Sequence, residues 1–164
     1  MTYANQLFAT TNQSQNTDER YTPTWLVAAL GLFDLDPCSP AAGPSHGCAI
    51  KWFSPADDGL VQPWHGRVWM NPPFSDARPW AEKFVSHGDG IALLPVSNAI
   101  WRVEAMRRAD LVWFPGDIKF YGPTHAQQRI SMPIFLMAIG EDNKNSLTEL
   151  ATAGLCPGVL FRPL

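Results

Sequence analysis

The feature that most constrains the fold of this chain is a pair of consecutive prolines, Pro72 and Pro73, placed directly after the short apolar run Val68–Met70. The apolar run has the character of a strand. Proline has no N–H group for a sheet hydrogen bond and restricts the residue before it, so the strand has to end at Asn71. In an open α/β sheet the ligand site lies beyond the carboxyl ends of the strands. We therefore expect Asn71 and Phe74 on the rim of such a site.

Strand and helix patterns alternate along the chain, which predicts an α/β fold. Segments 90–95 and 111–116 are continuous apolar runs, typical of strands buried on both faces. Segments 77–87 and 98–108 carry apolar residues at helical spacing, and Asn98 is placed to cap the second helix. Further strands are expected at 32–38, 132–139 and 158–161, with a weakly helical segment within 140–154. The pattern predicts a doubly wound, mostly parallel sheet with right-handed crossovers and helices on both faces.

The length of 164 residues fits one domain, and the sequence shows no internal repeat. Residues 1–20 are rich in Thr, Asn and Gln without a sustained period, so we expect a flexible N-terminal arm. The domain then spans residues 21–164. Within it, residues 39–54 are rich in glycine and proline and are expected to form a loop.

The composition argues for a cytoplasmic protein without a membrane span. The sequence has no run of about 18 apolar residues and no secretory signal at its N-terminus. Its three cysteines are an odd number and widely spaced, which is typical of a reduced state. Cys38, His46 and Cys48 are a conceivable set of metal ligands, but the chain has no C-x-x-C pair, so no metal site is expected.

The net charge of −3 is unusual for a protein that binds nucleic acid, because contacts to phosphates supply much of the affinity of such proteins. A local cluster of basic residues would be needed. The basic residues that are candidates for such a cluster are Lys51, Arg67, Arg78, Lys83, Arg102, Arg107, Arg108, Lys119 and Arg129. A scattered, solvated distribution of these residues is the alternative.

Two local patterns precede the proline pair. Thr22 and Pro23 are typical of the N-cap and the first position of a helix. Asp34 and Asp36 alternate along the short strand that follows, which a proline ends. Carboxylates in an apolar strand are costly to bury unless a partner pairs with them. We therefore expect these residues either in local structure or in contact with a ligand.

The residues at the proline pair suit chemistry on an aromatic amine. The lone pair of such an amine is spread into the ring, so the nitrogen is a poor nucleophile. The side-chain oxygen of Asn71 and the carbonyl of Pro72 can each accept one N–H of the amine and stabilise it as positive charge develops. Phe74 offers a flat face for a base, and such stacking contributes about 1–3 kcal/mol per base. A plain turn at the two prolines is the alternative.

Asn71-Pro72-Pro73-Phe74 resembles the (Asn/Asp/Ser)-Pro-Pro-aromatic motif of amino-methyltransferases that use S-adenosylmethionine. The wider chain is similar to the phage-type, Dam-like DNA N6-adenine methyltransferases. The segments that carry this resemblance are Thr22-Pro23, Asp36-Pro37-Cys38, Asn71-Pro72-Pro73-Phe74 and Gly116-x-x-Lys119-Phe120, in that order. The resemblance implies a single-domain Rossmann-like methyltransferase fold, S-adenosylmethionine as cofactor and double-stranded DNA as partner. It also implies that the target adenine is flipped out of the duplex.

The resemblance further implies roles for individual residues. The implied catalytic residues are Asn71, Pro72, Pro73 and Phe74, the implied cofactor-binding residues are Thr22, Pro23, Asp36, Cys38 and Asp58, and the implied substrate-binding residues are Lys119 and Phe120. Asp34 is a second choice for the acidic residue at the cofactor. The chain departs from the family at two places. Asp117 replaces the usual arginine, and the compact glycine-rich turn of larger methyltransferases is replaced by a loose segment from Gly43 to Gly47.

Two other functions stay open at this point. The first is methylation of another amine, such as N4 of cytosine, an RNA base or a protein amide. The second is a non-catalytic module that keeps the fold and binds nucleic acid or a partner protein. In the enzyme interpretation the protein acts in the cytoplasm, that of the host if a phage encodes it, and no obligate protein partner is expected.

Overall fold

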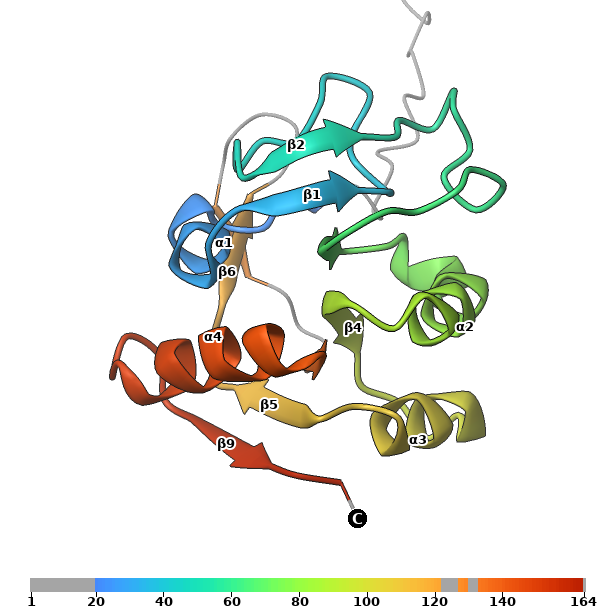
Figure 1. Ribbon diagram of the computed structural model, residues 1–164. Helices are drawn as coiled ribbons and strands as arrows, with labels where there is room; N and C mark the ends of the chain where they lie inside the picture. The colour runs from blue at the N-terminus through green and yellow to red at the C-terminus, as the bar shows by residue number, and fades with distance from the viewer. Residues whose placement is uncertain (1–19, 122–126, 130–132, 164) are drawn as a thin grey trace, which may run out of the picture.

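The computed structural model describes residues 20–121, 127–129 and 133–163. Its central feature is a seven-stranded sheet in the order β2-β1-β3-β4-β8-β5-β9 (Figure 1). The strands of this sheet are β1 (Phe33–Asp36), β2 (Ala49–Trp52), β3 (Val68–Met70), β4 (Gly90–Pro95), β5 (Leu111–Pro115), β8 (Ile134–Ile139) and β9 (Gly158–Phe161). Strands β6 (Lys119–Tyr121) and β7 (Gln127–Arg129) form a separate two-stranded sheet. The expected arm, residues 1–20, lies outside the described residues except for Arg20.

The large sheet is mixed, which differs from the mostly parallel sheet that the sequence predicts. Strands β2, β1, β3 and β4 pair in parallel, whereas β8 runs antiparallel to both β4 and β5, and β9 runs antiparallel to β5. Strand β8 follows β5 without an intervening helix among the described residues, since only β6 and β7 come between them. A parallel neighbour needs a crossover, which is usually a helix, and the described part of this connection contains none.

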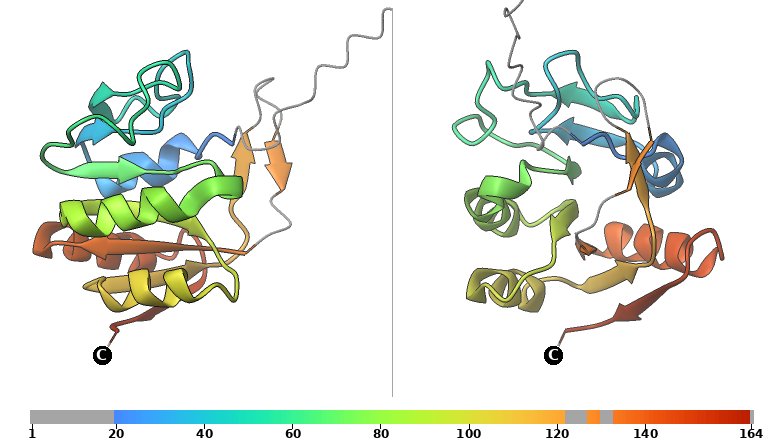
Figure 2. Two further views of the ribbon diagram at one scale, coloured as in Figure 1. Left: turned by 90° about the vertical axis from the view of Figure 1, so that its right-hand side faces the viewer. Right: turned by 180° about the vertical axis from the view of Figure 1, so that it is seen from behind.

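Helices cover both faces of the sheet, as the sequence predicts (Figure 2). The helices are α1 (Thr24–Leu30), α2 (Ala77–His87), α3 (Ile100–Arg107) and α4 (Glu141–Thr152). Alternate strand residues point to opposite faces, so Ile91 and Leu93 pack in the core with α1 and α4, while Ala92 and Leu94 pack in the core with α2 and α3. No helix in the described part of the chain is long and apolar enough to cross a membrane.

Two local expectations are wrong, and a third is confirmed. Residues 49–52 form strand β2 inside the segment expected to be a loop, and this edge strand is largely exposed, so it lacks a strong apolar signal. The N-cap of α3 is Ala99 and not Asn98, and no side chain caps this helix. In these two cases packing against neighbouring elements outweighs the local pattern. The helix expected within 140–154 is confirmed and forms the 12-residue helix α4.

Arg67, directly before β3, fixes the position of α1 and α4 against the sheet. Its guanidinium donates to the carbonyls of Leu30 at 2.9 Å and Leu32 at 3.0 Å, and to Oδ1 of Asn143 at 2.6 Å. Its backbone N–H donates to the carboxylate of Asp34 at 2.7 Å. Asp34, the second choice for a cofactor contact, is exposed and serves this structural cluster.

Candidate functional site

A cavity of about 190 Å³ opens at the carboxyl ends of β1 and β3. Residues from three segments line it, namely 20–22, 36–46 and 69–73, and Pro55 completes the wall. Its volume is below the roughly 300–1,000 Å³ of typical ligand pockets, so a molecule of cofactor size would fill it and extend beyond it. A second hollow, between α2 and α3, is lined by side chains such as Trp101, Glu104 and Arg108 and by no residue from the strand ends.

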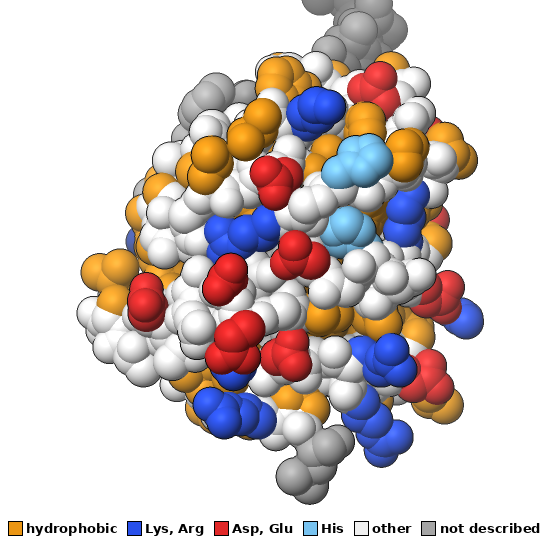
Figure 3. Space-filling view, in the orientation of Figure 1, with side chains coloured by type: hydrophobic (Ala, Val, Ile, Leu, Met, Phe, Trp, Pro, Cys, Tyr) orange, Lys and Arg blue, Asp and Glu red, His pale blue; other side chains and the backbone are white. Residues whose placement is uncertain are grey.

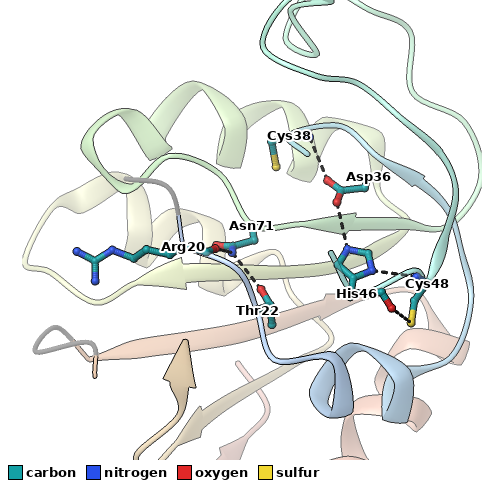
Figure 4. Close-up of polar contacts among 7 residues, drawn as sticks. All are labelled: Arg20, Thr22, Asp36, Cys38, His46, Cys48 and Asn71. Atoms are coloured by element: carbon teal, nitrogen blue, oxygen red, sulfur yellow. Dashed lines mark hydrogen bonds and ion pairs between the residues drawn. The ribbon is translucent and has the colours of Figure 1, made fainter. Parts of the chain in front are cut away.

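Asn71 is the first residue after β3 and lines the cavity. Its side-chain Nδ2 donates to the Arg20 carbonyl at 3.1 Å and to the Thr22 hydroxyl oxygen at 3.0 Å (Figure 4). A carbonyl can only accept, so the contact with Arg20 fixes which end of the amide is the nitrogen. The other end, Oδ1, is buried and has no hydrogen-bond partner among the described residues. An unsatisfied buried acceptor costs about 1–3 kcal/mol, so this position favours a ligand that brings a donor.

The other residues of the Asn-Pro-Pro-Phe motif differ in their exposure. Pro72 is buried, Pro73 is exposed and lines the cavity, and Phe74 is half-buried. Phe74 packs against the core on the side of α1, and the guanidinium of Arg20 lies over its ring, 6.0 Å from the centroid. A base that stacks on Phe74 must share this face with Arg20 or displace the arginine.

The Thr22 hydroxyl accepts a hydrogen bond from Asn71 and does not cap helix α1, which follows it in the chain. The N-cap of α1 is Pro23, without a side-chain hydrogen bond, so the cap predicted at Thr22 is wrong. Thr22 is buried and lines the cavity, whereas Pro23 is buried outside the lining. Tyr21 pairs antiparallel with Tyr121 through backbone hydrogen bonds of 2.8 and 3.0 Å. The segment before α1 is therefore fixed between the end of β3 and strand β6.

Asp36, the last residue of β1, is 4% exposed and lines the cavity. Its Oδ1 accepts the backbone N–H of Cys38 at 3.2 Å, and its Oδ2 lies 3.2 Å from Nε2 of His46. The backbone N–H of Cys48 donates to Nδ1 of His46 at 3.0 Å, so the proton of the ring is on Nε2 and is donated to Asp36 (Figure 4). The partners that make burial of this carboxylate tolerable are thus Cys38 and His46.

Cys38 lies beside Asp36 and lines the same cavity. Burial, and then the nearby Asp36 carboxylate, raise the pKa of the Cys38 thiol well above its usual value of 9.0, while a hydrogen bond from the backbone of Asn71 acts in the opposite direction. The thiol is therefore protonated at neutral pH. A protonated thiol is a poor nucleophile, so Cys38 is not poised to act as one at neutral pH.

The remaining predicted residues lie outside the cavity lining. Asp58 is exposed in a turn, where its carboxylate accepts the N–H of Leu60 at 3.2 Å. Phe120 is 1% exposed in the core on the α1 side, so its ring is not accessible to a base. Its neighbour Lys119 is exposed on β6. Strand alternation explains this difference, because successive side chains of β6 point to opposite sides.

Several of the basic side chains donate hydrogen bonds to other groups of the protein. Arg67 holds α1 and α4, Arg102 is buried and donates to Ser97 Oγ, and Nζ of Lys83 donates to three carbonyls of residues 59–62. Burial lowers the pKa of Lys83. On the face shown in Figure 3, basic and acidic side chains are interspersed. The exposed cationic surface is therefore smaller than the count of Lys and Arg indicates.

Metal ligands do not gather in the part of the chain that the structure describes, where no group of three or more His, Cys, Asp or Glu side chains is placed to hold an ion. His46 instead binds Asp36, and the Cys48 thiol donates to the His46 carbonyl at 3.1 Å. In the sequence, His46 is a candidate only for a metal site, and Ser39 is a candidate for no site. Nothing in the local sequence marks either residue, because both come from the irregular segment 39–54.

The raised pKa of the Cys38 thiol predicts slow alkylation at neutral pH. The folded protein should react with iodoacetamide at Cys38 only well above pH 9, and later than at Cys48, whose pKa is raised by burial alone. The unfolded thiol loses its proton nearer pH 9, so the free energy of unfolding should fall as the pH rises through this range. Peptide mass spectrometry after timed labelling measures the rates. Rapid labelling of Cys38 at pH 8 would contradict the described environment.

A family model described as DNA N-6-adenine-methyltransferase (Dam) matches residues 9–147, which include the cavity residues and all elements from α1 to β8. No curated protein and no solved structure matches the chain. Since the family model covers most of the chain, this protein belongs to the Dam family of DNA N-6-adenine-methyltransferases.

Proposed function

We propose that this protein transfers a methyl group from S-adenosylmethionine to N6 of adenine in double-stranded DNA. The observation that carries the proposal is the buried Oδ1 of Asn71, which has no partner among the described residues and belongs to a cavity-lining side chain at the end of β3. Family membership makes adenine in DNA the expected substrate. We also propose that residues 21–164 form one domain with a Rossmann-like methyltransferase fold, acting in the cytoplasm.

The cavity residues fit the proposed cofactor. Asp36 has carboxylate lone pairs beyond the two that Cys38 and His46 use, so it can accept donors from an amine or from hydroxyls. Trp69 and the lining prolines give apolar walls for the less polar parts of such a molecule. When bound, S-adenosylmethionine supplies an electrophilic methyl group. We therefore assign the segment 36–46 to cofactor binding and the segment 71–74 to the target base.

Asn71 and Pro72 have the central role in the proposed reaction. The side-chain oxygen of Asn71 and the carbonyl of Pro72 each accept one N–H of the target amine, which stabilises the positive charge that develops on nitrogen. Asn71 needs no reorientation, because both hydrogens of its Nδ2 are already bound by Arg20 and Thr22. This preorganisation is the source of the expected rate enhancement.

The target adenine has to leave the duplex to reach this edge of the sheet, at a cost of a few kcal/mol. Stacking on Phe74 offsets about 1–3 kcal/mol of that cost. The guanidinium of Arg20, now over the Phe74 ring, is close enough to the same face to contact the base or an adjacent phosphate. With a net charge of −3, the protein should bind DNA weakly and with strong salt dependence.

Replacing Asn71 by Ala tests the proposal most simply. The variant should lose roughly 10²–10³-fold in methylation, because it lacks an acceptor used in the transition state, while it still binds S-adenosylmethionine. The measurement is transfer of labelled methyl groups to unmethylated DNA, followed by digestion and identification of the methylated nucleoside. Asn98→Ala, at an exposed asparagine before α3, is the matched control and should behave as wild type.

The same assay separates the alternatives. Label found in N4-methylcytosine, or transfer only to RNA or protein, would show that the protein methylates an amine other than adenine N6. Wild-type protein that neither transfers label nor gains thermal stability from S-adenosylmethionine would instead be a non-catalytic module. Unchanged methylation by Asn71→Ala would remove the assigned role of the amide.

Thr22 is predicted to position Asn71. Thr22→Val removes the hydroxyl that accepts from Nδ2, so the amide loses one of its two anchors, whereas Thr22→Ser keeps the acceptor. We expect kcat to fall about 5-fold or more in the valine variant, in line with one lost hydrogen bond, and to recover in the serine variant. Steady-state kinetics with varied cofactor measures this. A raised KM for S-adenosylmethionine with an unchanged kcat would mean that Thr22 contacts the cofactor instead.

A further inference from the structure

Three side chains at the end of β1 are not explained by catalysis at Asn71. Asp36, Ser39 and His46 are 4%, 2% and 7% exposed, and all three line the cavity. They come from β1 and from the irregular segment after it. Two of them, Ser39 and His46, match no motif in the sequence.

His46 holds the Asp36 carboxylate in one orientation. Its Nε2 lies 3.2 Å from Oδ2 of Asp36, and the Cys48 N–H at Nδ1 fixes the tautomer that donates to the carboxylate. The ring also lies edge-on to Trp69, with centroids 6.2 Å apart and planes at 77°. Asp36 is therefore held from two sides, by His46 and by the N–H of Cys38 at 3.2 Å. Each carboxylate oxygen accepts one of these two hydrogen bonds and keeps a second lone pair for another donor.

Ser39 is different, because its hydroxyl lacks a partner. Its backbone N–H donates to the Phe53 carbonyl at 3.0 Å, which fixes the residue in place. Its Oγ is buried and makes no hydrogen bond to any described residue. Buried hydroxyls are nearly always hydrogen-bonded in native proteins, so an unpaired one in a cavity wall indicates a partner that arrives with a ligand.

We propose that Ser39 and Asp36 form an anchoring subsite for a group of S-adenosylmethionine that carries N–H or O–H donors, with Ser39 contacting the cofactor and His46 positioning Asp36. The shared chemistry is a carboxylate that accepts and a hydroxyl that can both donate and accept. A protonated amine and a pair of ribose hydroxyls both have this chemistry, and the cofactor contains both. The inference rests on the proposed function.

If Ser39 contacts the cofactor, its replacement should have an effect that a purely structural role of Ser39 does not predict. In the free protein the Ser39 hydroxyl is unsatisfied, so Ser39→Ala should leave the melting temperature unchanged or raise it. The same change should weaken binding of S-adenosylmethionine about 5- to 10-fold, the effect of one lost hydrogen bond. Ser86→Ala, at an exposed serine on α2, is the matched control and should change neither quantity.

His46 needs a pair of variants, because it acts through Asp36. His46→Gln keeps an N–H donor near the position of Nε2 and should bind the cofactor nearly as wild type does. His46→Leu removes the donor and should weaken binding about as much as Asp36→Asn. The double variant with His46→Leu and Asp36→Asn should bind the cofactor no more weakly than the weaker-binding of the two single variants, since both changes disable the same carboxylate. The melting temperature of each variant separates loss of binding from loss of folding.

The experiment is calorimetric titration of the full chain with S-adenosylmethionine and with 5′-methylthioadenosine, which keeps the ribose but lacks the amino acid. A Ser39→Ala effect on both ligands assigns the subsite to the ribose hydroxyls, and an effect on S-adenosylmethionine alone assigns it to the amine. Either result supports the inference. Unchanged affinity of Ser39→Ala for both ligands overturns it, and equal affinities of His46→Leu and wild type overturn the positioning role. Wild-type protein that binds neither ligand overturns the proposed function itself, and the subsite with it.

Discussion

The double hydrogen bond of the Asn71 side chain is the interaction on which the candidate site depends. Two prolines force the chain out of the sheet after β3, and this leaves an amide at the edge whose nitrogen is bound by Arg20 and Thr22. Both hydrogens of Nδ2 are thereby used, and Oδ1 is left without a partner among the described residues. The same contacts join the segment before α1 to the end of β3, and the Tyr21–Tyr121 pairing extends this connection to β6.

Two unsatisfied polar side-chain atoms lie at the cavity, which supports the proposal that a ligand binds there. Among the described residues, four buried side-chain atoms lack a hydrogen-bond partner: Ser39 Oγ, Asn71 Oδ1, Arg102 Nε and Trp113 Nε1. Two of the four belong to side chains that line one cavity at the carboxyl ends of β1 and β3. Such atoms are rare in native proteins because each lacks a bond that water would supply. Their concentration here agrees with a site where a cofactor and a base bring the missing partners.

The sequence predicts those parts of the site that local chemistry determines. A proline follows Asp36 and another follows Asn71, so the sequence places both residues at the ends of strands. The two residues do line one cavity. His46 and Ser39 were not predicted as cavity residues, because their positions depend on how an irregular segment folds back onto β1. Asp58 was expected at the cofactor, but the local Asx turn with Leu60 holds its carboxylate. The antiparallel placement of β8 was also not predicted, since strand direction depends on connections and not on apolar pattern.

The central claim is that the cofactor binds at the carboxyl ends of β1 and β3. The most direct measurement is a titration of isotope-labelled protein with S-adenosylhomocysteine, followed by two-dimensional NMR of the backbone and side-chain amides. The largest shifts are expected at Cys38, Ser39 and the side-chain amide of Asn71. Shifts confined to the hollow between α2 and α3, at Trp101 and Glu104, would contradict it.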